Sequence, residues 1–156
     1  MNLLSLFVWF SLCADQDART RKVSNWITFG GILCALLYLL ITGISLLGAP
    51  SSEAWGALLL TVILTVPGYA LKKLGAGDVK LLFALALASS TYHILGTFIG
   101  AGATTVVWLL ARQKIWPHMP QWFTSRYVCL SPESSNKQPF VPFLLAGFAG
   151  TAWYLH

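Results

Sequence analysis

Long apolar runs separated by short polar stretches are the feature that most restricts what this chain of 156 residues can fold into. The clearest run covers residues 26–47 and is long enough for a helix to cross a bilayer, which takes roughly 20 apolar residues. Only 10% of the residues are charged, against roughly 25% in an average soluble domain. Because lipid offers no partners for backbone polar groups, such runs must be helical, and we predict an all-α, polytopic integral membrane protein.

Six transmembrane helices are expected, within a single membrane-embedded domain that covers residues 1–156. The first apolar run is too short to cross a bilayer alone, so flanking residues must also be helical, and we expect it to be a retained membrane segment because no Ala-x-Ala site follows it. Pro67 is expected to kink the third helix. The run 81–111 is too long for one crossing, and the polar residues Ser89–His93 predict a helical hairpin. The predicted segments are 2–14, 26–47, 55–71, the two halves of 81–111, and 139–155.

The basic residues predict the orientation of these helices. All ten fall in the first, third and fifth connections, and the positive-inside rule places those connections in the cytoplasm. Despite a net charge of +5, nucleic-acid binding is not expected, because these residues flank apolar segments instead of forming one patch. The fifth connection, 112–137, mixes basic with aromatic residues, as segments in the lipid headgroup region do. The ten are Arg19, Arg21, Lys22, Lys72, Lys73, Lys80, Arg112, Lys114, Arg126 and Lys137.

Three of the five acidic residues, Asp15, Asp17 and Asp78, stand where an apolar helix meets a predicted cytoplasmic connection, whereas Glu53 and Glu133 fall in predicted solvated loops. The predicted topology puts Asp17 and Asp78 on the same membrane face. Two carboxylates brought close together share one proton, and such a pair can activate a water as a base and protonate a leaving amine as an acid. The alternative is that both are ordinary charged groups at helix ends. The residues alone leave both interpretations open.

Three motifs resemble those of type IV prepilin peptidases. Residues 75–81, GAGDVKL, are similar to the GxGDxKL motif of that family. Asp17, followed eight residues later by Asn25 with basic residues between them, resembles a second motif. Residues 139–143, PFVPF, resemble the Pro-Phe-x-Pro-Phe that opens the family's last helix. The motifs occur in order and at matching places of a six-helix layout, so the resemblance covers nearly the whole chain.

The resemblance implies an aspartyl endopeptidase with Asp17 and Asp78 as its catalytic pair. Asp17 is preferred to Asp15 because only Asp17 has the eight-residue spacing to Asn25. The implied substrates are type IV prepilins or pseudopilins, whose short basic leader is cut after a glycine that precedes the hydrophobic helix. The implied location is the inner membrane of a bacterium, with the site at its cytoplasmic face. The bilayer and the substrate are therefore the expected partners.

Four residues are expected to support this pair. Gly75 and Gly77 lack a Cβ, so backbone and substrate can approach Asp78 closely and unusual backbone dihedrals are accessible. Lys80 either interacts with Asp78 or substrate, or serves as a topology anchor, and Asn25 completes the first motif. Val23-Ser24 replaces the family's usual Ile-Pro, and we expect a shifted loop there. Longer family members carry a cysteine-bearing insertion in the first connection, associated with N-methylation; this connection has no cysteine, so only peptidase activity is implied.

The sequence leaves two alternatives to a prepilin peptidase. The first is a GxGD intramembrane protease that uses the same two aspartates on a non-pilin substrate. The second is a small transporter or assembly factor, which would place acidic residues near mid-membrane, and the apolar runs contain none. No cofactor and no metal are expected, because an aspartyl pair uses water. Cys13 and Cys34 are expected to be packing residues.

Overall fold

The structure is a computed structural model that describes residues 2–20, 22–72, 74–131 and 139–155. The described residues are mostly α-helical and contain no β-strand, so the all-α prediction is confirmed. Arg21, Lys73, Glu133, Lys137 and His156 lie outside these ranges. The helices are α1 (Asn2–Thr20), α2 (Asn25–Thr42), α3 (Ser51–Ala70), α4 (Ala76–Ala88), α5 (Thr91–Ile115), α6 (Gln121–Arg126) and α7 (Val141–Leu155), with short 3₁₀ turns at Trp116–His118 and Val128–Leu130.

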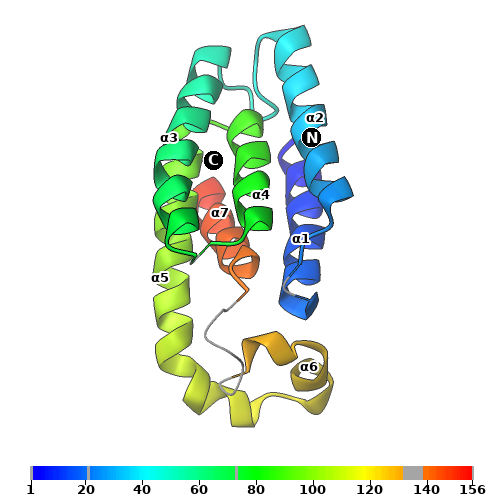
Figure 1. The fold of residues 1–156 in the computed structure, drawn as a ribbon, viewed down its shortest axis with the longest axis vertical. Helices are drawn as coiled ribbons and strands as arrows, with labels where there is room; N and C mark the ends of the chain where they lie inside the picture. Colours follow the sequence, from blue (N-terminus) through cyan, green and yellow to red (C-terminus); the bar gives the residue numbers. More distant parts are fainter. Residues whose placement is uncertain (1, 21, 73, 132–138, 156) are drawn as a thin grey trace.

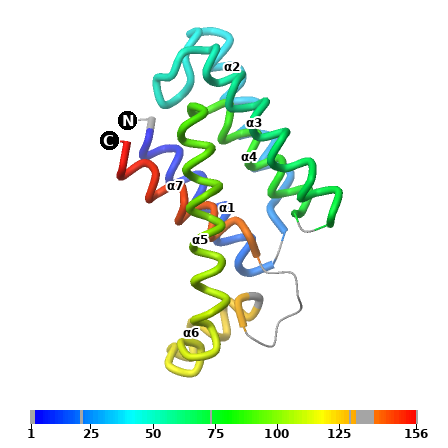
Figure 2. The backbone as a smooth tube through the Cα atoms, turned by 90° about the vertical axis from the view of Figure 1, so that its left-hand side faces the viewer, coloured from blue at the N-terminus to red at the C-terminus, as the bar shows by residue number. Residues whose placement is uncertain are grey.

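The six longer helices run alternately down and up the molecule (Figure 1). Side-chain packing links them in the order α1, α7, α5, α3, α4, α2, and α1 touches α2 only over a short stretch. The bundle is therefore an open ring whose weak join lies between α1 and α2. Figure 2 shows the beginning of α1 beside the end of α7, and α5 extending past the other helices to α6. Leu81, Leu82 and Leu85 on α4 are fully buried, which makes α4 the most enclosed helix.

The outward faces of the longer helices are apolar. Large side chains such as Leu40, Ile63 and Leu110 are 58–77% exposed, as expected for surfaces that lipid covers. Three described helical segments are long and apolar enough to cross a membrane, Asn25–Thr42, Ser51–Ala70 and Thr91–His118, and Val141–Leu155 is a shorter apolar helix. The count of six crossings stays a prediction, because α4 has only 13 residues, about 20 Å of helix against a core of about 30 Å.

Several predicted boundaries need correction. Helix α1 continues to Thr20, so most of the predicted first connection is helical and Asp17 lies within a helix instead of a loop. Helix α2 ends at Thr42 rather than at residue 47, because Gly43 adopts the left-handed conformation that ends a helix, with φ 73°. Helix α3 continues through Pro67, which stands in its last turn and does not break it. The predicted hairpin is confirmed, since α4 ends at Ala88 and α5 begins at Thr91.

Helices α5 and α7 make the closest helix contact of the bundle. A Cβ added to Gly147 would lie 2.3 Å from the carbonyl oxygen of Thr97, and one added to Gly100 would lie 2.7 Å from the Cα of Gly147. These two glycines therefore let the backbones of the two helices meet, as small residues do in membrane proteins. A Cβ at Gly150 would meet nothing within 4 Å, so Gly150 does not take part in this contact.

Candidate active site

A polar cleft with a volume of about 460 Å³ lies where α1 and α3 end and where α2, α4 and α7 begin. Both Asp17 and Asp78 line it, so the structure brings together two carboxylates that are 61 positions apart in the sequence (78 − 17). All four expected supporting residues line it as well. The full lining is Asp17, Lys22, Val23, Asn25, Lys72, Leu74, Gly75, Ala76, Gly77, Asp78, Lys80, Pro139 and Phe140.

Asp17 is held in the cleft by the start of the last helix. Its side chain is only 5% exposed, and its Oδ2 accepts a hydrogen bond of 3.1 Å from the backbone N–H of Val141, the first residue of α7. This contact joins the end of α1 to the beginning of α7. Sequence reasoning placed the PFVPF motif at this helix start but did not anticipate that its backbone binds Asp17.

Asp78 stands in the first turn of α4, before the apolar part of that helix. Its Oδ2 accepts a hydrogen bond of 3.0 Å from the N–H of Gly75. The pKa of Asp78 is raised to about 6, chiefly by burial and next by the negative charge of Asp17, while the Gly75 hydrogen bond lowers it by less. Asp78 therefore does accept a hydrogen bond at a helix end, as the alternative interpretation expects. The same carboxyl group also interacts with the charge of Asp17.

Asn25 and Lys80, which come from two different motifs, are joined across the cleft. The ammonium of Lys80 donates a hydrogen bond of 3.1 Å to Oδ1 of Asn25 and lies 4.6 Å from the ring centroid of Phe29. Lys80 thus reaches to α2 rather than to Asp78, which was one of the expected partners. This contact ties the start of α2 to the start of α4, and so holds together the two segments that carry the motifs.

The comparison with family models gave one finding. A model described as the type IV leader peptidase family matches residues 4–110, more than two thirds of the chain. The chain belongs to the type IV leader peptidase family. It is a leader-peptidase-like protease, and the resemblance inferred from the motifs is confirmed at this level. Neither the comparison with curated proteins nor that with solved structures gave a match.

The matched region of the chain includes both aspartates, Asn25 and the GAGDVKL segment, whereas the PFVPF segment lies beyond it. The contact between Val141 and Asp17 is therefore an observation of the structure that is independent of the family match. It shows that the last helix completes the cleft. The described residues contain no group of three or more His, Cys, Asp or Glu side chains placed to hold a metal ion.

Asp15, which lies two residues before Asp17, has different surroundings. Its carboxylate forms a salt bridge of 2.7 Å with Arg19 and accepts a hydrogen bond of 2.8 Å from the hydroxyl of Tyr127. The hydrogen bond from Arg19 is the main reason that the pKa of Asp15 is lowered. Asp15 does not line the cleft, and it links α1 to the segment that follows α6.

Two expectations drawn from the sequence concern backbone conformation: unusual dihedrals at the motif glycines and a shifted loop at Ser24. Gly75 has φ −78° and ψ 153°, which any residue adopts, so no unusual dihedral is needed there. Its missing Cβ matters through space, because a Cβ would lie 3.2 Å from Oδ2 of Asp78, whereas one at Gly77 would make ordinary contact with Val23. Ser24 has φ −59°, a value that proline also adopts, so the local backbone gives no support to the expected loop shift. Its N–H donates to Oε1 of Gln16 at 3.1 Å.

Proposed function

We propose that this leader peptidase is an aspartyl endopeptidase in which Asp17 and Asp78 remove the leader from type IV prepilins or pseudopilins. The observation that carries the proposal is that these two carboxyl groups line one polar cleft, close enough for the charge of Asp17 to raise the pKa of Asp78. Each also accepts a backbone hydrogen bond that fixes its position. A pair held in this way can bind one proton between its two members.

The chemistry follows from that shared proton. The ionised carboxylate removes a proton from a water molecule, whose oxygen attacks the carbonyl carbon of the scissile peptide bond. The protonated carboxyl group donates its proton to the carbonyl oxygen and becomes a carboxylate. The intermediate then collapses: the C–N bond breaks, the leaving nitrogen takes the proton that came from the water, and the second carboxylate takes a hydroxyl proton, which restores the shared proton. The raised pKa of Asp78 suits it to the protonated member, which leaves Asp17 as the carboxylate that activates the water.

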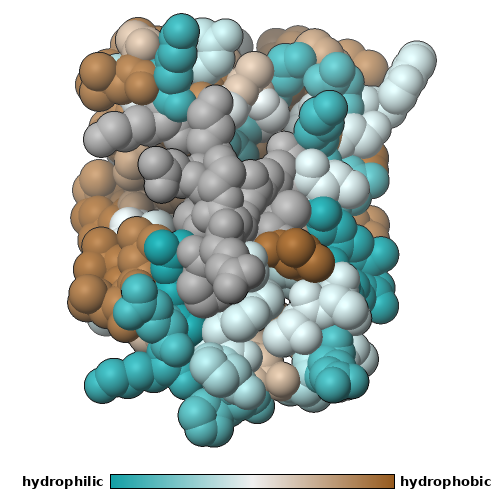
Figure 3. Space-filling view, turned by 60° about the horizontal axis from the view of Figure 1, so that its bottom comes forward, coloured by the Kyte–Doolittle hydropathy of each residue, from teal (hydrophilic) through white to brown (hydrophobic). Residues whose placement is uncertain are grey.

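The position of the cleft supports cleavage at the cytoplasmic face of the inner membrane. The described basic residues of the first and third connections lie at the same end of the bundle as the two aspartates, and Lys22, Lys72 and Lys80 line the cleft itself. Figure 3, which brings this end of the molecule forward, shows hydrophilic side chains on several sides of the face. A membrane substrate whose leader extends into the cytoplasm would present its scissile bond at this level.

The test is processing of a model prepilin in detergent or vesicles by the wild type and three variants. Asp17→Asn and Asp78→Asn are expected to abolish cleavage, because an amide cannot exchange the proton that the pair needs. Asp15→Asn is the matched control, since it removes a carboxylate two residues away that lies outside the cleft, and it should retain processing.

Two outcomes would contradict the proposal. Normal processing by Asp17→Asn and Asp78→Asn would show that the two aspartates are not the catalytic pair. If the wild type cleaves no prepilin but cuts another membrane substrate in a manner that depends on both aspartates, the pair stands and the substrate is not a pilin.

A further inference from the structure

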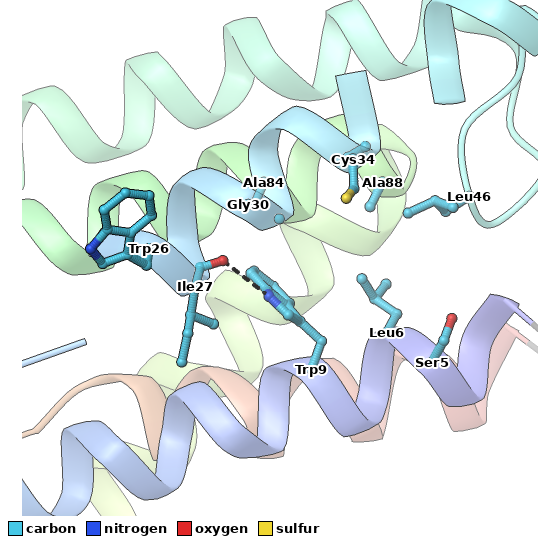
Figure 4. A pocket seen from close by; sticks show the side chains of 12 residues that line it. Ser5, Leu6, Trp9, Trp26, Ile27, Gly30, Cys34, Leu46, Ala84 and Ala88 are labelled. Carbon is cyan, nitrogen blue, oxygen red and sulfur yellow. Dashed lines mark hydrogen bonds between the residues drawn. The ribbon is translucent and has the colours of Figure 1, made fainter. Parts of the chain in front are cut away.

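We infer that the gap in the helix ring between α1 and α2 is the binding site for the hydrophobic helix of the substrate. This inference rests on the proposed function, because it assumes a substrate with an apolar helix next to its scissile bond. The gap holds a groove with a volume of about 420 Å³, formed by one face of α1, one face of α2 and the end of α4. In Figure 4, Leu6 and Trp9 on α1 face Gly30 and Cys34 on α2.

Trp9 forms a fixed wall of this groove. Its indole Nε1 donates a hydrogen bond of 3.3 Å to the carbonyl oxygen of Ile27, drawn as a dashed line in Figure 4. The ring lies against Gly31, where an added Cβ would come within 2.4 Å of it. Trp9 therefore reaches from α1 to α2 and forms one side of the groove, with its indole held by both contacts.

The remaining lining suits the close approach of a helix. Ala35, Ala84 and Ala88 are buried at the bottom of the groove, whereas Gly30 is exposed along it. Small residues are what allow helices to approach each other in a membrane. A Cβ added to Gly30 would meet nothing within 4 Å, so this position faces open space. Cys34 lines the groove and is exposed, which corrects its expected packing role; Cys13 is buried as expected.

The groove leads directly to the cleft. Trp26 lines the groove, and the preceding residue, Asn25, lines the cleft that holds both aspartates. From Ile27 to Ala35 the groove follows nine residues of α2, or eight steps of about 1.5 Å, which is about 12 Å. An apolar helix seated there would place its cytoplasmic end at the mouth of the cleft, where a leader peptidase must cut. This continuity selects a substrate helix over a lipid chain or a second copy of the enzyme.

Cys34 offers a direct test by crosslinking. The probe is a model prepilin that carries a single cysteine at successive positions after the scissile bond, mixed with Asp78→Asn enzyme and a short bis-maleimide. Cys34 lies nine residues beyond Asn25 (34 − 25), so crosslinking should peak about nine residues after the scissile bond and recur every three to four residues. The additional change Cys34→Ser should remove the crosslink.

A second test fills the groove without touching the cleft. Gly30→Leu projects into the open space of the groove, and Gly102→Leu is the matched control, because its Cβ also meets nothing within 4 Å but lies on α5 away from the groove. With Asp17 and Asp78 intact, Gly30→Leu should lower kcat/KM for the prepilin at least ten-fold, mainly through KM. Gly102→Leu should match the wild type, and both variants should be as stable as the wild type.

The outcomes separate the groove from the substrate assignment. Three results would each overturn the proposal that the groove binds the substrate helix. They are normal processing by Gly30→Leu, crosslinks that do not depend on Cys34, and a crosslink between the Cys34 residues of two enzyme copies. If the wild type cleaves no prepilin but the apolar helix still crosslinks periodically to Cys34, the groove stands and the pilin substrate falls.

Discussion

The two ends of the helix bundle are built in opposite ways. At the end away from the cleft, the helices are joined by tight turns in which backbone groups bind backbone groups. Ser45 N–H donates to the carbonyl of Ala49 at 2.7 Å, and Leu47 N–H donates to that of Ala88 at 3.0 Å. At the cleft end, acidic and basic side chains make the links, from Asp17 to Val141 and from Lys80 to Asn25.

This difference bears on where a peptide can be bound and cut. At the end away from the cleft, paired backbone groups close the turns, and the buried Ser90 hydroxyl and His93 Nδ1 bond to each other at 2.9 Å. Ionisable side chains held around a cleft of about 460 Å³ keep their protons exchangeable and leave space for a peptide. The closed end and the close contact between α5 and α7 therefore hold the scaffold, while the open end carries the reaction. Variants that affect one property and spare the other test this division.

The largest effect on the scaffold is expected at Gly147. Gly147→Leu would push a side chain into the backbone of α5, where a Cβ alone comes within 2.3 Å of Thr97 O. Because backbone atoms cannot rotate away, the loss of stability should exceed the roughly 1–3 kcal/mol typical of overpacking. Gly150→Leu, on the same helix but facing open space, should be tolerated. Thermal unfolding in detergent measures both, and equal stability of the two variants would contradict the close contact.

The next effect concerns stability at the cleft, where Asp78→Asn should stabilise the protein above pH 6. The folded pKa of Asp78 is about 6, above its ordinary value of 3.8, so the folded state holds this proton more tightly than the unfolded state does. Stability from this group is therefore complete below about pH 4 and is lost as the pH rises through 6. The shift corresponds to on the order of 2–3 kcal/mol.

Unfolding of the wild type and of Asp78→Asn at several pH values checks this prediction. The variant should be the more stable of the two at pH 8, and the difference should shrink toward pH 4. If the wild type is as stable as the variant at pH 8, Asp78 is solvated and its pKa is not raised. Asp78 would then behave as an ordinary carboxyl group at a helix end.

A moderate effect on activity is expected at the link between the two motifs. Lys80→Ala and Asn25→Ala each remove one side of a partly exposed hydrogen bond, which is worth roughly 1 kcal/mol, or about a five-fold loss of kcat/KM. The double variant should lose little more than either single one, because both act through the same contact. Fully additive losses would mean that the two residues serve the cleft independently, for example by binding substrate separately.

The features of the molecule that could be predicted from the sequence are those that depend on residues close together in the chain. Apolar runs, the Ser89–His93 break and the spacing of Asp17 to Asn25 all follow from neighbouring residues. What could not be predicted depends on how distant segments meet. The N–H of Val141 binds Asp17 across 124 positions, and the gap between α1 and α2 exists only because the ring does not close. A backbone donor and the small extent of a helix contact leave no signal in residue types.

The smallest effect on activity is expected at Tyr127, whose hydroxyl bonds to Asp15 beside the cleft. Tyr127→Phe removes the 2.8 Å hydrogen bond to Asp15 but keeps the ring, which packs 4.8 Å from that of Phe123. Because Asp15 retains its salt bridge to Arg19 and the site is partly exposed, activity should change less than about three-fold, as the loss of one exposed hydrogen bond predicts. A much larger loss in prepilin processing would mean that the segment after α5 controls the cleft through Asp15 and α1. The cleft end of the bundle would then include the polar segment that follows α6 as well as the helices that carry the two aspartates.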